Sequence, residues 1–295
     1  MDKRAVTKGH LSAFITIFIW GTTFISTKLL LKDFSPVEIM FFRLVVAYAA
    51  LILISPRFIP FKSWQEELVW MVAGLCGVTL FFLFQNIALS YTLASNASVL
   101  ISVSPFFTAI FSRYFLKNEQ FHAGFFIGFA VSIIGIALIA FNGNFVLKLN
   151  PLGDLLALLC AVVWAIYTIL INRRSVQDTN TVQVTRRVFF YGVIFLIPGL
   201  FLFDFHPDLT RLADLPNLLN ILFLGVGASA LSFLTWNYAV RILGAVKTSI
   251  YIYVIPIITI LMSAIVLREP VTGVAISGVA LILLGLYLSE RKPKM

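Results

Sequence analysis

The sequence predicts an all-α membrane protein with ten transmembrane helices, arranged as two inverted five-helix repeats. Three observations lead to this prediction. Of the 295 residues, 60% are hydrophobic and only 12% are charged, whereas about a quarter of the residues of a soluble domain are charged. The apolar residues form runs of roughly 20, the length at which a helix spans ~30 Å of hydrocarbon. Finally, uncommon residue types recur in the same order in the two halves of the chain.

Charges and turn-forming residues separate the ten apolar segments. The expected spans of the first half are about 11–31, 36–55, 67–90, 95–116 and 121–141. Those of the second half are about 152–172, 186–203, 217–240, 245–267 and 271–289. The seventh span is short because Arg186 and Arg187 precede it, and a start near Thr181 is the alternative. The two predicted domains are therefore the repeats 11–141 and 152–289.

The net charge of +9 comes from basic residues that lie in short clusters between the apolar runs. This placement is typical of cytoplasmic loops, and it does not favour a nucleic-acid partner. If both termini are cytoplasmic, few basic loop residues remain on the opposite side: Lys28, Lys32, Lys148, Arg211 and Arg268. The sequence therefore predicts a multi-pass protein of the cell (inner) membrane, with the lipid bilayer as its partner and both termini in the cytoplasm.

The internal repeat has a functional consequence. The matching residues are Trp20 and Trp164, Arg43 and Arg187, Asn86 and Asn237, and Pro105 and Pro256. Because each half holds an odd number of spans, the second half must enter the membrane from the opposite side. Many secondary transporters are built from such inverted repeats, with a binding site near the midplane and alternating access to it. The repeat therefore predicts a carrier of small solutes.

Polar and aromatic residues inside the spans are candidates for the substrate cavity, because polar groups in lipid usually face the bundle interior. The candidates are Trp20, Thr23, Arg43, Gln85, Asn86, Ser98, Ser102, Trp164, Tyr167, Trp236, Asn237 and Tyr253. They would suit a small amphipathic solute. The alternative is that the hydroxyls bond their own helices and the larger groups only pack. Pro105 and Pro256 predict mid-span kinks, which act as hinges or merely shape the bundle.

Arg43 is the least ordinary candidate, since it lies seven residues into its span, ~10 Å along the helix axis. It could bind a carboxylate through two hydrogen bonds. We favour instead an extended side chain that reaches the lipid headgroups, or a pair with a neighbouring acid. For Arg187, which is closer to the end of its span, we expect contact with the headgroups even more.

The acidic residues and histidines all fall in loops or near span ends, which argues against a central carboxylate that couples transport to protons. Enzyme motifs and phosphate-binding loops are absent from the sequence. Cys76 and Cys160 lie within apolar runs and lack metal-ligand spacing. The sequence thus predicts no catalytic activity, no metal site and no cofactor.

Several short motifs resemble a known family when they are taken in order. They are Trp20-Gly21, the segment Ala94 to Ser98 followed by Pro105, and Leu-Arg-Glu-Pro at 267–270. The chain resembles the EamA-type members of the drug/metabolite transporter superfamily. The resemblance implies export or exchange of amino acids or related metabolites. It also implies that the glycine-rich fifth and tenth spans pack at the periphery or between subunits, which allows a homodimer.

Two alternatives to amino-acid export stay open. Carriers of phosphorylated or nucleotide-linked sugars belong to the same superfamily, but their substrates should demand several buried Lys or Arg. In this sequence only Arg43 is a fair candidate. Outside transport, the chain could be a membrane scaffold or receptor, in which the cavity candidates would serve only for packing.

Overall fold

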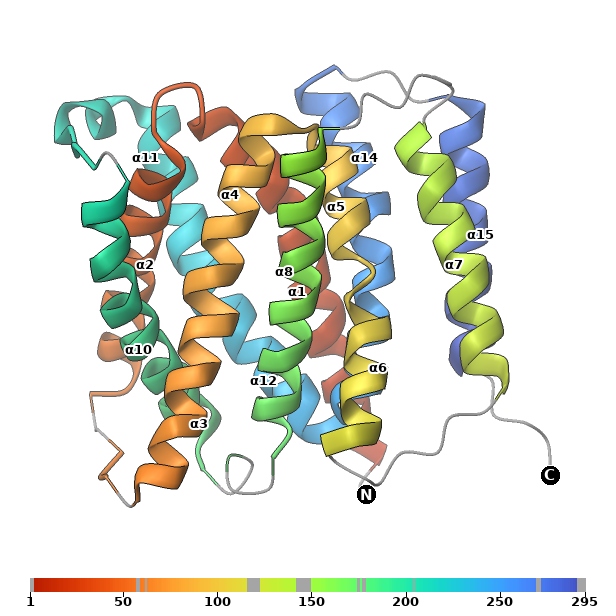
Figure 1. Cartoon of the computed structure of the whole chain (residues 1–295), viewed down its shortest axis with the longest axis horizontal. Helices are drawn as coiled ribbons and strands as arrows, with labels where there is room; N and C mark the ends of the chain where they lie inside the picture. The colour runs from red at the N-terminus through yellow and green to blue at the C-terminus, as the bar shows by residue number, and fades with distance from the viewer. Residues whose placement is uncertain are drawn as a thin grey trace.

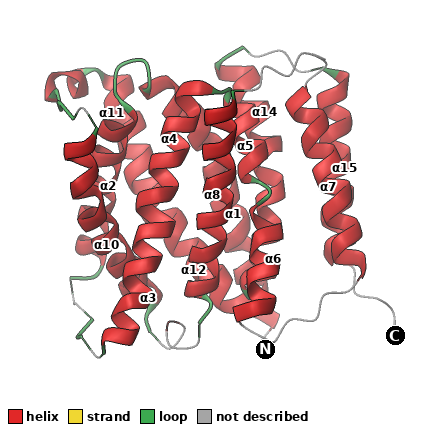
Figure 2. Cartoon of the chain, in the orientation of Figure 1, coloured by secondary structure: helices red, strands yellow, loops and turns green. Residues whose placement is uncertain are grey.

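The computed structural model describes residues 3–56, 59–61, 63–115, 123–141, 150–173, 176, 179–203, 205–268 and 272–290. Over these residues the chain is a bundle of long helices joined by loops, without strands (Figures 1 and 2). Eight helical segments are long and apolar enough to cross a membrane: Lys3–Leu30, Pro36–Ile54, Trp64–Tyr91, Ala94–Phe115, Pro151–Ile171, Thr181–Leu202, Leu215–Leu243 and Ala245–Val266. The predicted all-helical membrane class is confirmed.

Four of the spans are single uninterrupted helices. They are α1 (Lys3–Leu30), α2 (Pro36–Ile54), α8 (Pro151–Ile171) and α10 (Thr181–Leu202). Helix α2 starts sharply because the Ser35 side chain accepts a hydrogen bond from the Glu38 amide while the Glu38 carboxylate accepts one from the Ser35 amide. Helix α10 begins at Thr181, as in the alternative considered above, and therefore includes both Arg186 and Arg187.

The third and eighth spans share an irregularity. Each contains a central π-helical segment, where the backbone is wound more loosely than in an α-helix. The third span consists of α3 (Trp64–Gly74), η1 (Leu75–Leu80) and α4 (Phe81–Tyr91). The eighth consists of α11 (Leu215–Leu222), η3 (Phe223–Leu231) and α12 (Ser232–Leu243), preceded by the short 3₁₀ helix η2 (Leu209–Ala213).

The fourth and ninth spans are both interrupted beside a proline. The fourth consists of α5 (Ala94–Ile101) and α6 (Ser104–Phe115), and the ninth of α13 (Ala245–Ile250), the 3₁₀ segment η4 (Tyr251–Val254) and α14 (Ile255–Val266). Pro105 and Pro256 are each the second residue of the helix that follows the interruption. Proline is tolerated there because the first helical amides have no partner within the helix. The structure interrupts both spans beside these prolines, and a hinge motion stays a prediction.

Helices α7 (Ala123–Phe141) and α15 (Gly273–Glu290) pack against each other at one edge of the bundle (Figure 1). Glycines allow the close approach, since a Cβ atom built on Gly135 would lie 2.5 Å from the Gly278 carbonyl oxygen. The apolar parts of these helices, Gly124–Leu138 and Ile276–Ser289, are shorter than those of the eight segments above. Ten membrane crossings therefore stay a prediction.

Helices α1 and α8 run in opposite directions, and so do α2 and α10. Lys28, near the end of α1, donates a 2.9 Å hydrogen bond to the Thr92 carbonyl, and Asn150, at the start of α8, donates one of 3.3 Å to the Tyr91 carbonyl. The end of α1 and the start of α8 thus meet the same end of α4. Arg186, near the start of α10, likewise donates to the carbonyl of Ser55, which follows α2.

Candidate functional site

Five aromatic side chains meet in the middle of the bundle, and we call them the central aromatic cluster: Trp20, Trp164, Tyr167, Phe233 and Trp236. The rings of Trp20 and Trp164 are perpendicular, with centroids 4.9 Å apart. The ring of Trp236 lies 5.1 Å from Trp20 and 5.6 Å from Trp164. The structure therefore brings together the three tryptophans that the sequence proposed for the cavity, from α1, α8 and α12.

The indole nitrogens of the cluster differ in their partners. Trp20 donates a 3.0 Å hydrogen bond to the Ala228 carbonyl in η3. Trp164 and Trp236 are buried, and their Nε1 atoms have no hydrogen-bond partner within the described residues. A buried donor without an acceptor costs about 1–3 kcal/mol. A ligand with acceptor atoms could satisfy these two donors.

Tyr167 and Asn237 take part in a buried hydrogen-bond chain. The Tyr167 hydroxyl donates to Asn237 Oδ1 over 2.7 Å, and Asn237 Nδ2 donates to the Thr185 hydroxyl over 2.9 Å. The chain joins α8, α12 and α10. In this conformation the two predicted cavity residues therefore serve as an interhelical link.

The small hydroxyl candidates mostly bond their own helices. Thr23 donates to the Trp20 carbonyl, and Ser98 donates to the Ser95 carbonyl, each over 2.7 Å. Ser102 donates to the Ser98 carbonyl over 2.7 Å, and its hydroxyl also lies 3.3 Å from the Ile252 carbonyl oxygen in the ninth span. These contacts agree with the local bonding that was the alternative to cavity lining.

Three further cavity candidates, Gln85, Asn86 and Tyr253, are also buried. Gln85 is only 4% exposed. Asn86 donates a 3.0 Å hydrogen bond to the Pro36 carbonyl, while its buried Oδ1 accepts none from the described residues. The buried Tyr253 hydroxyl likewise lacks a partner among the described residues. Free polar atoms are thus available on α4 and η4 as well as on the central aromatic cluster.

Arg43 lies inside the bundle and not at the headgroups. The residue is 2% exposed, and its Nε donates to the Ser229 hydroxyl in η3 over 3.2 Å. The guanidinium carbon lies 3.7 Å from the centroid of the Phe82 ring. Within the described residues no carboxylate pairs with Arg43, and its buried Nη1 has no partner. The side chain does not extend toward the headgroups as expected, because α2 turns it toward α4 and η3, and the expected acidic partner is absent among the described residues.

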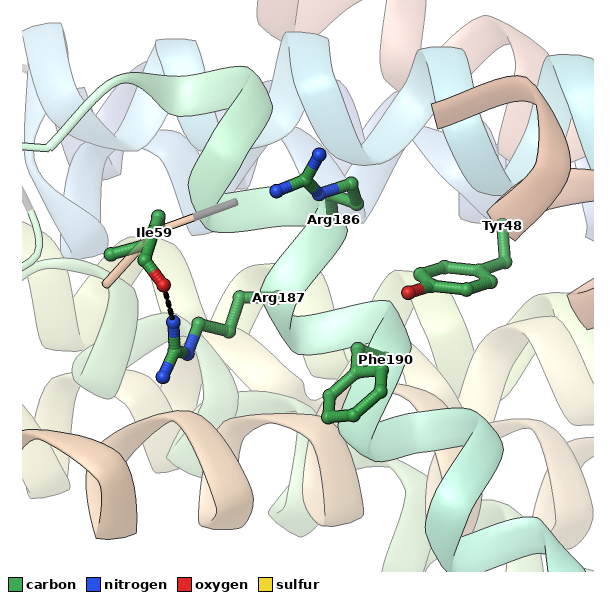
Figure 3. A pocket seen from close by; sticks show the side chains of 5 residues that line it. All are labelled: Tyr48, Ile59, Arg186, Arg187 and Phe190. Carbon is green, nitrogen blue, oxygen red and sulfur yellow. Dashed lines mark hydrogen bonds between the residues drawn. The ribbon is translucent and has the colours of Figure 1, made fainter. Parts of the chain in front are cut away.

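A pocket of about 140 Å³ lies between α2, α10 and the segment that follows α2 (Figure 3). Its lining consists of Tyr48, Ile59, Arg186, Arg187 and Phe190. None of these residues is among the predicted cavity residues. From the sequence we expected headgroup contact for Arg187, although its repeat match with the cavity candidate Arg43 points toward the interior of the bundle.

Both arginines of this pocket have protein partners. Arg187 forms an ion pair with Glu67 of α3 and donates to the Ile59 carbonyl, and Tyr191 donates to the same Glu67 carboxylate. Arg186 is 2% exposed and donates to the Ser55 carbonyl. An acid from the neighbouring helix thus holds the guanidinium of Arg187, and contact of this residue with the headgroups stays a prediction.

The described residues contain no group of three or more His, Cys, Asp or Glu side chains that could hold a metal ion. Cys76 and Cys160 are buried free thiols. The chemistry available at the centre of the bundle is therefore hydrogen bonding, aromatic contact and one guanidinium charge.

Comparisons with known proteins agree with this picture. Residues 7–141 and 151–291 each match the EamA-like transporter family. An uncharacterized transporter of Archaeoglobus fulgidus is 32% identical over 299 residues, which cover 97% of this chain and 98% of the relative. A protein of Streptantibioticus cattleyicolor named "Probable terminal-alkyne amino-acid exporter" is 25% identical, with 94% and 92% of the two chains covered. A solved crystal structure with 19% identity shares the fold, with a TM-score of 0.73 over 95% of this chain and 97% of that chain.

Proposed function

Because the chain belongs to the EamA-like transporter family, we propose that this multi-pass membrane transporter exports or exchanges small metabolites, amino acids first among them, by alternating access. The observation that carries the proposal is the central aromatic cluster. Its tryptophans come from both family matches, and two of their indole donors are buried without partners in the described structure. A solute at this place would contact both halves of the chain.

Alternating access requires the two halves, 11–141 and 152–289, to be inverted repeats that move against each other. Three features support this arrangement. The mates α1 and α8 run in opposite directions, as do α2 and α10. The third and eighth spans carry matching π-helical segments. The fourth and ninth spans are broken beside matching prolines, which would then serve as hinges.

The chemistry of the cluster favours an amino acid over the alternative substrates. Aromatic walls suit an apolar side chain, and unpartnered donors suit a carboxylate. The name of the Streptantibioticus cattleyicolor relative points in the same direction. A phosphorylated or nucleotide-linked sugar calls for several cations at the site, whereas Arg186 and Arg187 are already bonded near one end of α10. A scaffold would gain nothing from costly unpartnered donors, and the family match is to transporters and not to receptors.

The proposed setting is the inner membrane, with both termini in the cytoplasm. The basic residues at the ends of the described helices support this orientation. Helices α6, α8 and α12 end on the side of the bundle where α1 begins (Figure 1), and Arg113, Arg173 and Arg241 lie in or just after their last turns. A homodimer would use the edge formed by α7 and α15, which is a proposal from the family resemblance.

A counterflow screen tests the function directly. Purified protein is reconstituted into liposomes loaded with one unlabelled amino acid, and uptake of the same labelled amino acid is measured. We expect transient accumulation for at least one apolar amino acid and none in protein-free liposomes. Trp164→Phe, which removes the indole donor, should weaken transport, whereas Trp64→Phe at a 77% exposed position should not. Absence of counterflow for amino acids and related metabolites alike would overturn the proposal.

A further inference from the structure

Arg43 is the one charged group that contacts the rings around the central aromatic cluster in the described structure. Its guanidinium lies on Phe82 of α4, and the Phe82 ring is 5.9 Å from Phe233 of the cluster. Its Nε bonds Ser229, which follows Ala228, the acceptor of the Trp20 indole. The charge is therefore connected to the cluster through α4 and through η3.

A cation in this position is costly without a counter-charge. Burial removes the hydration of the guanidinium, and only an acid or a set of hydrogen-bond acceptors can replace it. Arg43 is 2% exposed and obtains one hydroxyl and one ring face from the described residues. A packing role alone does not account for the charge, since an uncharged side chain of similar length could fill the same space.

The contacts of Arg43 leave one donor atom of the guanidinium without a partner in the described structure. Phe82 covers a face of the planar group, and Ser229 occupies the Nε position. The Nη1 atom is buried and has no partner in the described structure. Carboxylates bind arginine in the plane of the guanidinium, through its N–H groups. The geometry thus suits a carboxylate at Nη1.

We propose that Arg43 binds the carboxylate of the transported solute, so that the substrate class is a small monocarboxylate with an apolar body, such as an amino acid. The inference rests on the proposed transport function. The unpartnered indole donors of Trp164 and Trp236 also require acceptors, which agrees with an anion. One guanidinium matches one negative charge, whereas the phosphate of a sugar phosphate or nucleotide carries more.

The test measures a preference, which is independent of the amount of folded protein. Dissociation constants of purified protein are measured by calorimetry for the amino acids that counterflow identifies and for their primary amides, which lack the carboxylate. We expect the wild type to prefer the acid over the amide by about tenfold or more, the effect of one charge-assisted hydrogen bond. Arg43→Gln should bring the ratio close to one, and Arg43→Lys should restore part of the preference.

Arg113→Gln is the matched control, because it removes an exposed arginine at the end of α6 and should keep the wild-type ratio. If Arg43→Gln keeps the wild-type preference for the acid over the amide, the assignment of Arg43 is overturned. This includes the case in which the variant loses affinity for both ligands by the same factor. If the wild type neither moves nor binds any amino acid or related metabolite, the proposed function itself fails. If the wild type transports amino acids but binds the acid and the amide equally well, only the role of Arg43 is refuted.

Discussion

Asn237 is the middle member of a buried hydrogen-bond chain, and its replacement offers a test at the scale of single residues. In Asn237→Leu the new side chain has a similar volume, but it removes the Oδ1 atom that accepts the 2.7 Å hydrogen bond of the Tyr167 hydroxyl. We expect a loss of stability of about 1–3 kcal/mol, the cost of an unsatisfied buried polar group. The thermal unfolding midpoint in one detergent would show the loss.

The double variant Tyr167→Phe/Asn237→Leu is the control for this prediction. It removes both polar partners, and Thr185 keeps its own 2.9 Å bond to the Thr181 carbonyl. The double variant should therefore be more stable than the sum of the single losses predicts, by about 0.6–2 kcal/mol. Strictly additive losses would contradict a direct Tyr167–Asn237 interaction.

The sequence pointed to the three tryptophans that meet at the centre, but not to Phe233 beside them or to the bonding of each polar atom. The repeat match of Trp20 with Trp164 predicted two equivalent positions. In the structure the centroids of the two rings are 4.9 Å apart. The bonds of Ser98 and Tyr167 depend on side-chain rotamers and on the rotation of each helix. The environment of Arg43 depends on Phe82 and Ser229, which come from other spans and carry no signal in the local sequence.

At the scale of elements, the contact between α7 and α15 depends on glycines. A Cβ atom on Gly285 would lie 2.5 Å from the Gly128 carbonyl oxygen, whereas a Cβ atom on Gly273 would meet nothing within 4 Å. We expect Gly285→Ala to force the helices apart and to cost about 1–3 kcal/mol. Gly273→Ala, in the same helix, should leave the unfolding midpoint unchanged or slightly raised. Equal midpoints for the two variants would contradict the close packing.

The interrupted fourth and ninth spans provide a second test of elements. Pro256→Ala restores a backbone N–H at the start of α14 and should favour continuation of the helix. If the interruption is a hinge, the rate of counterflow should fall severalfold while solute binding changes little. Pro216→Ala is the control, since Pro216 is also the second residue of its helix but lies exposed at the start of α11. A rate equal to the wild type in Pro256→Ala would exclude the hinge.

Element types were predictable from the sequence, whereas their internal irregularities were only partly so. Pro105 and Pro256 predicted interruptions because proline lacks an amide hydrogen. The π-helical segments η1 and η3 carry no comparable signal, since a looser turn depends on packing. Gly77 of η1, for example, lies against Tyr167, whose Cγ would be 2.5 Å from an added Cβ atom. Such a contact between distant spans cannot be found from periodicity.

At the scale of the whole molecule, the inverted repeat requires an even number of crossings and therefore both chain ends on one side of the membrane. Lys8 of α1 and the 67% exposed Leu209 of η2 lie at opposite ends of the bundle, because Arg211 of η2 donates to the Asp33 carbonyl just after α1. Both native cysteines, Cys76 and Cys160, are buried and can be replaced by serine to remove background labelling.

Cysteine labelling would then decide both the parity and the orientation. In intact cells, an impermeant maleimide should label Leu209→Cys, whereas Lys8→Cys and a cysteine added at the C-terminus should react only after permeabilisation. This pattern follows from the excess of basic residues at the end of the bundle where α1 begins. If instead the two chain ends react in intact cells and Leu209→Cys reacts only after permeabilisation, the proposed orientation is inverted but the repeat is kept. Labelling of the two chain ends from different sides would require an odd number of crossings, and two antiparallel five-helix units could then not enclose the solute.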